Sequence, residues 1–471
     1  MYGDFEAIIG LEIHVQLKTN TKLFCSCPRK PEPIPNSNIC PICVGLPGVL
    51  PKPNKKAIVL GIRGSLLLNM KINKMSFFER KNYFYPDLPK NYQISQYRIP
   101  LAQDGYLEIK GGKRIGIQRL HLEEDAGKMI HAEGRSYVDF SRSGTPLCEI
   151  VTKPDISTPD EAYDFLVSLH KILTWCDITE GNMEEGHMRC DVNVSVKLKD
   201  SQKLGTKVEI KNVNSFGFVK EALEYEIERQ IEKIKRGDVL KQETRGYDPA
   251  TKKTFVMREK EFAHDYRYFP EPDLLPIFIE DSLLAEAKEG IRELPDQMKK
   301  RFQDVYKITE YAADILTSNR SLAEFFEDLA RQFEDKKLLA NFVLEEVLRA
   351  VNEGLCDLSK DSQNLKVVVK DILSSQIKGE LSRNLAKEAF REVVEGRADV
   401  KTAIEKRRVL TDYSEIEKVV QKVIESNPKE VQRYRSGEKK LLGFFVGQAN
   451  KLIKADPKLI MKIIQEKLEK D

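Results

Sequence analysis

The sequence predicts an α+β protein in which a domain built on an antiparallel sheet precedes two all-helical domains. Up to about residue 290 the chain is rich in glycine, proline and aromatic residues, and apolar and polar residues alternate in short runs. This pattern is typical of antiparallel strands that bury one face. After Leu294-Pro295 prolines become rare and apolar residues recur at helical spacing, which indicates amphipathic helices.

Six alternating runs predict strands of the first domain, with the turn Gly111-Gly112 before the second run. They span residues 8–17, 114–122, 137–142, 146–152, 188–197 and 207–211. Two helices are expected between these strands. One follows Thr158, which forms a capping-box pattern with Glu161, and the other runs from about residue 219 to 236 and ends at Gly237.

The helical part is predicted to contain a helical domain and a basic helical tail. Apolar stripes such as Leu322, Phe325, Phe326 and Leu329 mark the first, and Asn427-Pro428 is expected to break the tail. The expected domains are therefore 1–293, 294–408 and 409–471.

The distribution of charge is more informative than the net charge of +3. Residues 429–462 contain nine lysines and arginines against three acidic residues. Such a stretch fits contacts with nucleic-acid phosphates, or a solvated helical face in a lysine-rich protein. No apolar run approaches 18 residues and no signal peptide begins the chain, so we expect a cytoplasmic protein without membrane contact.

Four of the eight cysteines lie close together in the sequence, at Cys25, Cys27, Cys40 and Cys43. Two close pairs separated by a loop of this length predict a zinc site, and a disulfide is disfavoured in a reducing compartment. Four thiolates complete tetrahedral coordination, so the zinc would be structural and would fold a proline-rich loop.

Four of the predicted strands carry polar residues that are not needed to form a strand. Glu12 and His14 share one face of the first run, and Glu149 interrupts an apolar run. The other two strands contribute Glu123, Glu124 and Asp125, and Arg189, Asp191 and Asn193. Taken singly, each residue fits a solvent-facing strand position.

Taken together, the acidic residues indicate a metal site. Gathered carboxylates repel one another and persist only around a cation. Oxygen ligands with one histidine suit Mg²⁺ or Mn²⁺ bridging to nucleotide phosphates. The chain has no G-x4-G-K-[ST] segment and no G-x-S-x-G segment, which argues against a P-loop and against a serine amidase that makes ammonia.

Several longer blocks carry a resemblance to a known family. They are LEIHVQL (11–17), CPICVGLPG (40–48), RKNYFYPDLPK (80–90), HLEEDAGK (121–128), GTPLCEIVT (144–152), GNMEEG (181–186), RCDVN (189–193) and HDYRYFPEPD (264–273). In these blocks, which cover most of residues 5–280, the sequence resembles the B subunit of aspartyl/glutamyl-tRNA amidotransferase, the GatB family. The end of the helical part is similar to the tail module of that family.

The resemblance implies an activity and partners. The chain would use ATP to phosphorylate the side-chain carboxylate of Glu-tRNA(Gln), Asp-tRNA(Asn) or both, and ammonia would then displace phosphate. A partner A subunit would hydrolyse glutamine, a small C subunit would brace the pair, and ammonia would pass through a channel. The resemblance also implies a cradle like the catalytic fold of glutamine synthetase, and a tail that binds the tRNA.

The resemblance further implies a set of site residues. The catalytic magnesium ligands would be Glu12, His14, Glu124 and Glu149, with Asp191 close by. Strand parity alone would instead place Glu123 on the face of His121, so the choice of Glu124 depends on the family.

The nucleotide would be contacted by Arg189, Glu209 and Lys211, and Lys90 would lie at the mouth of the ammonia channel. The four clustered cysteines match a zinc set that part of the family has.

Three other functions compete with this one. A glutamate-specific archaeal-type subunit would need a large insert, for which the chain has little room. A non-catalytic tRNA-binding protein would bind tRNA without tRNA-stimulated ATP turnover, and a small-molecule amide ligase would act without tRNA.

Overall fold

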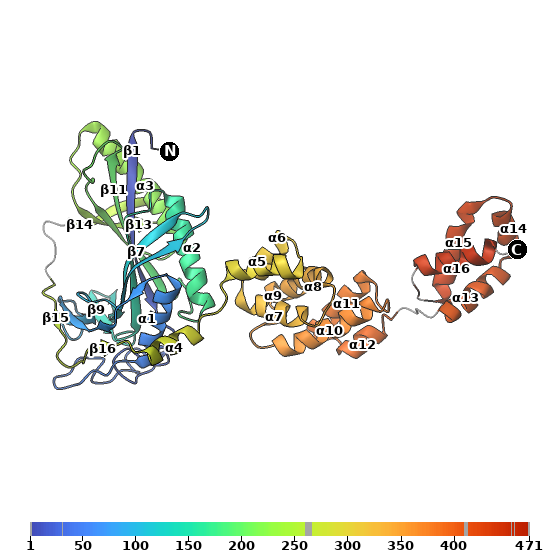
Figure 1. Ribbon diagram of the computed structural model, residues 1–471, viewed down its shortest axis with the longest axis horizontal. Coiled ribbons are helices and arrows are strands. Elements are labelled where there is room, and N and C mark those ends of the chain that lie inside the picture. Colours follow the sequence, from blue (N-terminus) through green and yellow to red (C-terminus); the bar gives the residue numbers. More distant parts are fainter. Residues whose placement is uncertain are drawn as a thin grey trace. The chain divides into compact units, whose positions relative to one another are not determined.

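The computed structural model describes residues 2–30, 32–259, 266–408, 413–453, 455 and 457–469. The chain forms two compact units, Met1–Glu293 and Leu294–Asp471 (Figure 1). His264 and Asp265 of the last motif block lie outside the described residues, as do residues 409–412, where the tail domain is predicted to begin. Lys454 and Asp456 of the basic stretch lie outside them as well.

A nine-stranded sheet forms the centre of the first unit, in the order β14-β13-β12-β11-β1-β10-β7-β6-β2. Neighbouring strands are antiparallel except for β12 and β13, which are parallel. The strands are β1 (Phe5–Gln16), β2 (Lys71–Ile72), β6 (Ala102–Glu108), β7 (Arg114–Glu124), β10 (Pro146–Thr152), β11 (Met188–Leu198), β12 (Val208–Val213), β13 (Glu243–Asp248) and β14 (Lys253–Glu259). The predicted α+β class with a mainly antiparallel sheet is confirmed.

The two faces of this sheet differ in character because the strand residues alternate. On β1 the side chains of Ile9, Ile13 and Val15 are fully buried. Helices α1 (Lys55–Leu67), α2 (Pro159–Trp175) and α3 (Phe216–Arg236) pack against the strands. The helices therefore cover the apolar face and leave the polar face, with Glu12 and His14, for a site.

The helices of the first unit were predicted in part. Helix α2 has the predicted cap, since Thr158 accepts a hydrogen bond of 3.1 Å from the Glu161 amide, and α3 ends at Gly237 with φ 77°. The prediction of only two helices is wrong, because α1 and the short α4 (Asp281–Glu289) are also present. Helix α1 is buried on nearly all sides, so it shows no clear apolar stripe in the sequence.

Smaller sheets complete the first unit. The strands β4 (Glu79–Asn82), β5 (Tyr92–Ser95) and β15 (Phe269–Pro270) form a three-stranded sheet in the order β15-β4-β5. Strands β3 (Met75–Ser76) and β16 (Ile277–Phe278) pair with each other, and β8 (Lys128–Ala132) pairs with β9 (Arg135–Asp139) in a hairpin. The strand predicted at 137–142 is thus β9, which begins and ends earlier than expected.

The described residues of the second unit are helical, as predicted. The helices are α5 (Pro295–Tyr306), α6 (Glu310–Leu316), α7 (Arg320–Ala330), α8 (Lys336–Phe342), the π-helix η1 (Val343–Val347), α9 (Leu348–Asn352), α10 (Ser362–Ile377), α11 (Arg383–Val394), α12 (Val400–Glu405), α13 (Tyr413–Glu425), α14 (Pro428–Arg435), the 3₁₀-helix η2 (Lys439–Leu441), α15 (Leu442–Leu452) and α16 (Pro457–Glu469).

The last helices, α13 to α16, bury a cluster of their own around Val420, Phe445 and Ile463. None of the helices in the described ranges is long and apolar enough to cross a membrane.

Candidate functional site

The polar face of the nine-stranded sheet brings the predicted site residues into two neighbouring rows. In one row His14 lies opposite Arg189 on β11 and Glu149 on β10, and Glu149 lies opposite His121 on β7. In the next row Glu12 lies opposite Asp191. Residues two apart on a strand share a face, which is why the alternation in the sequence could indicate these residues.

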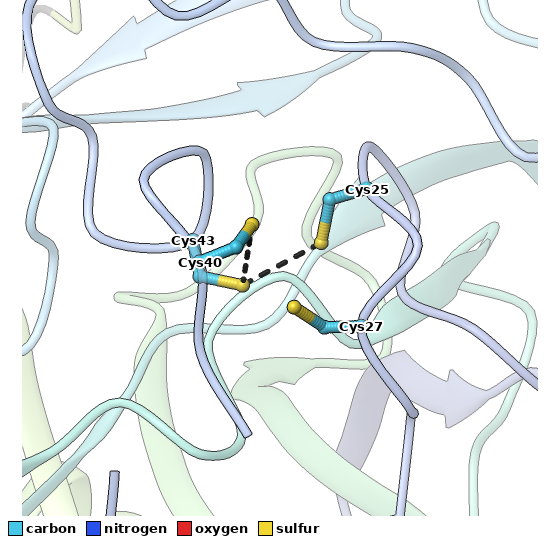
Figure 2. A group of neighbouring side chains, drawn as sticks. All are labelled: Cys25, Cys27, Cys40 and Cys43. Carbon is cyan, nitrogen blue, oxygen red and sulfur yellow. Dashed lines mark hydrogen bonds between the residues drawn. The ribbon is translucent and has the colours of Figure 1, made fainter. Parts of the chain in front are cut away.

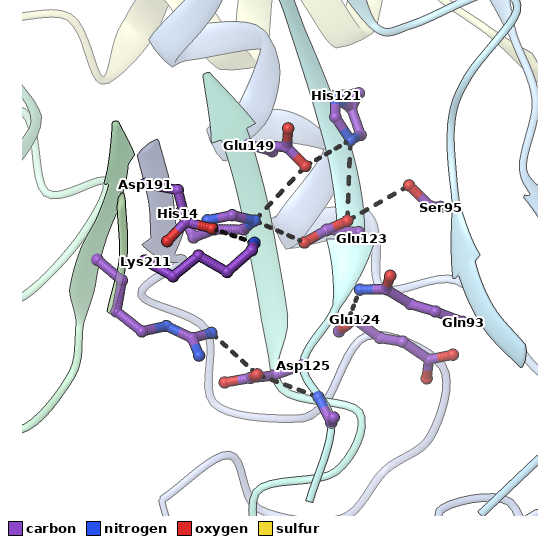
Figure 3. A network of polar contacts seen from close by, with 12 residues as sticks. His14, Gln93, Ser95, His121, Glu123, Glu124, Asp125, Glu149, Asp191 and Lys211 are labelled. Carbon is purple, nitrogen blue, oxygen red and sulfur yellow. Dashed lines mark hydrogen bonds and ion pairs between the residues drawn. The ribbon is translucent and has the colours of Figure 1, made fainter. Parts of the chain in front are cut away.

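A first cluster consists of His14, Glu123, Glu149 and His121 (Figure 3). His14 Nε2 lies 3.5 Å from Glu123 Oε1 and 3.5 Å from Glu149 Oε2. His121 Nε2 lies 3.2 Å from Glu149 Oε2 and 3.8 Å from Glu123 Oε2. Both carboxylates are thus placed between two imidazoles.

The groups of this cluster hold one another in their charged forms, and a metal ion bound there would take the place of the proton on His14. Burial lowers the pKa of His14, but the hydrogen bond to Glu149 and the charges of Glu149 and Glu123 outweigh burial and raise this pKa to about 9. Burial raises the pKa of Glu149, and the charge and hydrogen bond of His121 overcome it, so this pKa is lowered. The carboxylates are therefore charged at neutral pH. One ligand atom each from His14, Glu123 and Glu149 lies within 4.8 Å of the others, a donor set that suits Mg²⁺ or Mn²⁺.

A second cluster lies beside the first and consists of Glu12, Asp191 and Glu209, with carboxylate oxygens that also lie within 4.8 Å of one another. Lys211 Nζ lies 2.8 Å from Asp191 Oδ2 and 3.1 Å from Glu209 Oε1. Asn193 Nδ2 donates a hydrogen bond of 2.9 Å to Glu12 Oε1. An all-oxygen set of three carboxylates fits a hard divalent cation.

Glu124 lies apart from both clusters. Its carboxylate accepts hydrogen bonds from Lys90 Nζ and, at 3.0 Å, from the Ile94 amide. Because Glu123 and Glu124 are consecutive on β7, only one of them can share the face of His121. The structure brings Glu123 to His14 and Glu149, as parity predicts, and pairs Glu124 with the predicted channel residue Lys90.

Two of the three predicted nucleotide contacts, Glu209 and Lys211, line a cavity of about 820 Å³ on the polar face of the sheet. The third, Arg189, is not among the lining residues and donates a hydrogen bond of 3.0 Å to Asp125 Oδ1. The cavity combines acidic, basic and aromatic side chains: Glu12, His14, Lys81, Tyr97, Arg98, Arg119, His121, Glu149, Val151, Asp191, Lys207, Glu209, Lys211, Tyr266, Arg267 and Tyr268. Its size lies in the range of small-molecule and cofactor sites.

Several lining residues were not predicted as site residues. His121 follows the same alternation as Glu123 and could have been found from it. Lys81, Tyr97 and Tyr268 could not, because they belong to the three-stranded sheet and its flanks, whose strands are short and far apart in the sequence.

The four clustered cysteines converge at a separate place (Figure 2). The sulfur of Cys43 lies 3.5 Å from that of Cys25 and 3.7 Å from that of Cys40. Four sulfurs held 2.3 Å from a zinc ion would lie about 3.8 Å apart, so the spacing fits the metal.

The charge at the cysteine cluster also fits a metal. Lys22 Nζ lies 3.4 Å from Cys43 Sγ. The hydrogen bond from Cys25, together with this lysine, lowers the pKa of Cys43 to about 4, and the same hydrogen bond raises the pKa of Cys25. The lysine therefore stabilises one thiolate of the kind that zinc binds.

Comparisons with known proteins agree over almost the whole chain. Residues 7–285 match the GatB/GatE catalytic domain family, and residues 324–468 match the GatB domain family. The chain is 47% identical to the B subunit of the aspartyl/glutamyl-tRNA(Asn/Gln) amidotransferase of Persephonella marina, over 99% of this chain and 100% of the relative. It is 46% identical to the protein of the same name from Carboxydothermus hydrogenoformans and 48% identical to that from Thermotoga petrophila, with 99% of both chains covered in each case.

Proposed function

The chain belongs to the GatB family, the B subunits of aspartyl/glutamyl-tRNA(Asn/Gln) amidotransferase, and we propose that its cavity carries out the ATP-dependent step of that reaction. A side-chain carboxylate oxygen of Glu-tRNA(Gln), Asp-tRNA(Asn) or both attacks the γ-phosphorus of ATP, and the bond to ADP breaks. Ammonia then attacks the acyl carbon, and phosphate leaves. The product is Gln-tRNA(Gln) or Asn-tRNA(Asn).

The observation that carries this proposal is the cavity itself. Two clusters of acidic ligands lie on its sheet side, and Lys81, Arg119 and Lys207 line it as well. Phosphoryl transfer needs mainly positioning and neutralisation of phosphate charge, and both kinds of group are present. A subunit that only bound tRNA would have no use for such a cavity, so that alternative is not favoured.

The two clusters would hold the metal ions. In this proposal His14, Glu123 and Glu149 bind one Mg²⁺ or Mn²⁺, and Glu12, Asp191 and Glu209 bind a second. Metal bound there would neutralise charge on the phosphates of ATP. The chain's own groups fix the ligands: His121 donates to Glu149, and Asn193 orients Glu12.

Other residues take supporting roles in the proposal. Lys211 and Arg189 contribute positive charge near the nucleotide, and Lys90, paired with Glu124, guides ammonia that reaches the cavity. The four cysteines bind a structural zinc that fixes their loop. We also propose that the first unit, with its nine-stranded sheet, resembles the catalytic fold of glutamine synthetase.

The partners follow from the family name and the chemistry. The described chain has no group recognised as a glutaminase, so we infer a glutaminase A subunit and a small C subunit as partners. The helices after residue 409 would contact tRNA phosphates through basic residues such as Lys439 and Lys440. A cytoplasmic location follows from a tRNA substrate.

A transfer assay tests the proposal. The chain, assembled with its partner subunits, is incubated with γ-labelled ATP and either Glu-tRNA(Gln) or Asp-tRNA(Asn), and labelled acyl phosphate and amidated tRNA are measured. We expect tRNA-dependent transfer with at least one substrate. Glu149→Ala is expected to abolish transfer, while the glutaminase activity of the partner is unchanged. Tight tRNA binding without tRNA-stimulated ATP turnover would contradict the proposal.

A further inference from the structure

Lys81 differs from its neighbour Arg80 in what its side chain contacts. Both lie on β4, where consecutive side chains point to opposite faces. Arg80 donates two hydrogen bonds, of 2.7 and 2.8 Å, to the fully buried Glu271 and stacks on the Tyr92 ring at 4.3 Å. Lys81 instead lines the cavity that holds the acidic clusters. Arg80 therefore has a structural partner, and Lys81 faces the site.

The ammonium of Lys81 lies among tyrosine rings. Its Nζ is 5.1 Å from the centre of the Tyr266 ring and 5.9 Å from that of Tyr83. The part of the chain that the structure describes gives Lys81 no hydrogen-bond or ion-pair partner. Burial lowers the pKa of Lys81, but the charges of Glu123 and its neighbours raise it overall, so protonation of this lysine depends on negative charge around it.

The charge balance around Lys81 predicts that an anion binds beside its ammonium group. The inference rests on the proposed function, in which a divalent cation is bound by Glu123 and Glu149. These two carboxylates then balance the metal charge, and among the residues that the structure describes no other carboxylate forms an ion pair with the ammonium of Lys81. An unbalanced charge in a half-buried, aromatic-lined place is unfavourable. An anionic group brought by the substrate would remove that cost.

We propose that Lys81 contacts an oxygen of the γ-phosphoryl group while it is transferred from ATP to the side-chain carboxylate. In this step a carboxylate oxygen forms a bond to phosphorus, the bond between phosphorus and the ADP oxygen breaks, and its electron pair leaves with ADP. Lys81 keeps its proton throughout and donates a hydrogen bond to the charge that the phosphoryl oxygens carry. Lys81 would therefore be a catalytic residue, because it contacts the phosphoryl group that is transferred.

The surroundings of Lys81 support this role. Tyr97 and Tyr268 stack with ring centres 4.2 Å apart and planes 7° apart, and both line the cavity. The two rings form an aromatic wall of the cavity, and a fixed charge acts more strongly on a reacting group where bound substrate displaces water. Removing one such preorganised donor lowers kcat by about 10²–10³-fold in other enzymes.

The test compares Lys81→Met with the matched control Lys113→Met in the complete complex. Lys113 is also a partly buried lysine, but unlike Lys81 it pairs with a carboxylate, Glu161, at 2.7 Å, and it does not line the cavity. Single-turnover transfer of label from γ-labelled ATP to misacylated tRNA is measured. We expect Lys81→Met to slow transfer by about 10²–10³-fold with unchanged tRNA binding and glutaminase activity. Lys113→Met should match the wild type, and Lys81→Arg should regain part of the rate.

Two results would overturn the role of Lys81. One is transfer by folded Lys81→Met within about twofold of the wild type, far from the loss expected for a preorganised donor. The other is normal acyl phosphate formation with loss of amidation only, which would assign Lys81 to ammonia delivery. If methionine lowers the unfolding temperature, Lys81→Gln is judged by the same two criteria. Absence of transfer in the wild type would instead refute the proposed function, so the two failures are distinguishable.

Discussion

Gly45, in the loop that follows the cysteine cluster, lies close to the side chain of Lys90, and we expect a substitution there to disturb that lysine. Gly45 has φ +64°, and a Cβ added there would lie 2.5 Å from Lys90 Cγ and 3.3 Å from Lys90 Cα. Gly48, three residues on, has φ +84° but nothing within 4 Å of an added Cβ. Gly45→Ala and Gly48→Ala therefore impose similar backbone strain, and only the first adds a clash.

The expected magnitudes follow from these two terms. An alanine in the left-handed region costs roughly 1–2 kcal/mol, and this cost applies to both variants. Overpacking against Lys90 adds about 1–3 kcal/mol to Gly45→Ala alone. Because Lys90 Cγ has to move, its ion pair with Glu124 is expected to weaken as well.

Thermal unfolding and amidation of the assembled enzyme measure both effects. We expect Gly45→Ala to unfold at a lower temperature than Gly48→Ala. If Lys90 guides ammonia, Gly45→Ala should also lower glutamine-driven amidation more than amidation driven by added ammonium salt, whereas Gly48→Ala leaves this ratio at the wild-type value. Identical unfolding temperatures and ratios for the two variants would refute the reasoning, because the contact with Lys90 would then have no consequence.

Two further predictions follow from the clusters. Glu123→Gln should weaken Mn²⁺ binding, measured by titration calorimetry, by more than about tenfold. Glu124→Gln should leave Mn²⁺ affinity near the wild-type value, because only Glu123 lies beside His14. A larger loss of affinity in Glu124→Gln than in Glu123→Gln would instead identify Glu124 as the ligand. Cys43→Ser should reduce the zinc content, measured by elemental analysis, from one ion per chain to nearly none. It should also lower the unfolding temperature, because the loop has little apolar core of its own. A zinc-free wild type as stable as the zinc-loaded protein would contradict a structural metal.

The sequence predicted the polar face of the central strands well, because strand alternation is local. Glu12 with His14, and Asp191 with Asn193, needed only a period of two residues. Glu123 was also indicated by parity, whereas the choice of Glu124 came from the family and not from the pattern. Helix α1 was missed for the opposite reason, since a helix buried all round has no polar side to create a period.

The rest of the site depends on pairings that no local pattern contains. Strand β15 is two residues long and pairs with β4, about 190 residues earlier. This pairing brings Tyr268 and Lys81 to one cavity. Such contacts between distant short segments are set by the closure of the whole fold, so alternation and spacing cannot indicate them.

The position of β1 in the middle of the sheet has a consequence for biosynthesis. β1 leaves the ribosome well before its partners β10 and β11, which begin at Pro146 and Met188. At a translation rate of roughly 5–20 residues per second, synthesis of β11 is complete about 10–40 s after that of β1. During this interval Ile9 and Ile13 lack their final neighbours, and such unpaired strands are prone to aggregate. We therefore expect nascent chains that end before β11 to depend on chaperones that shield apolar segments, and chains released after it to depend on them less.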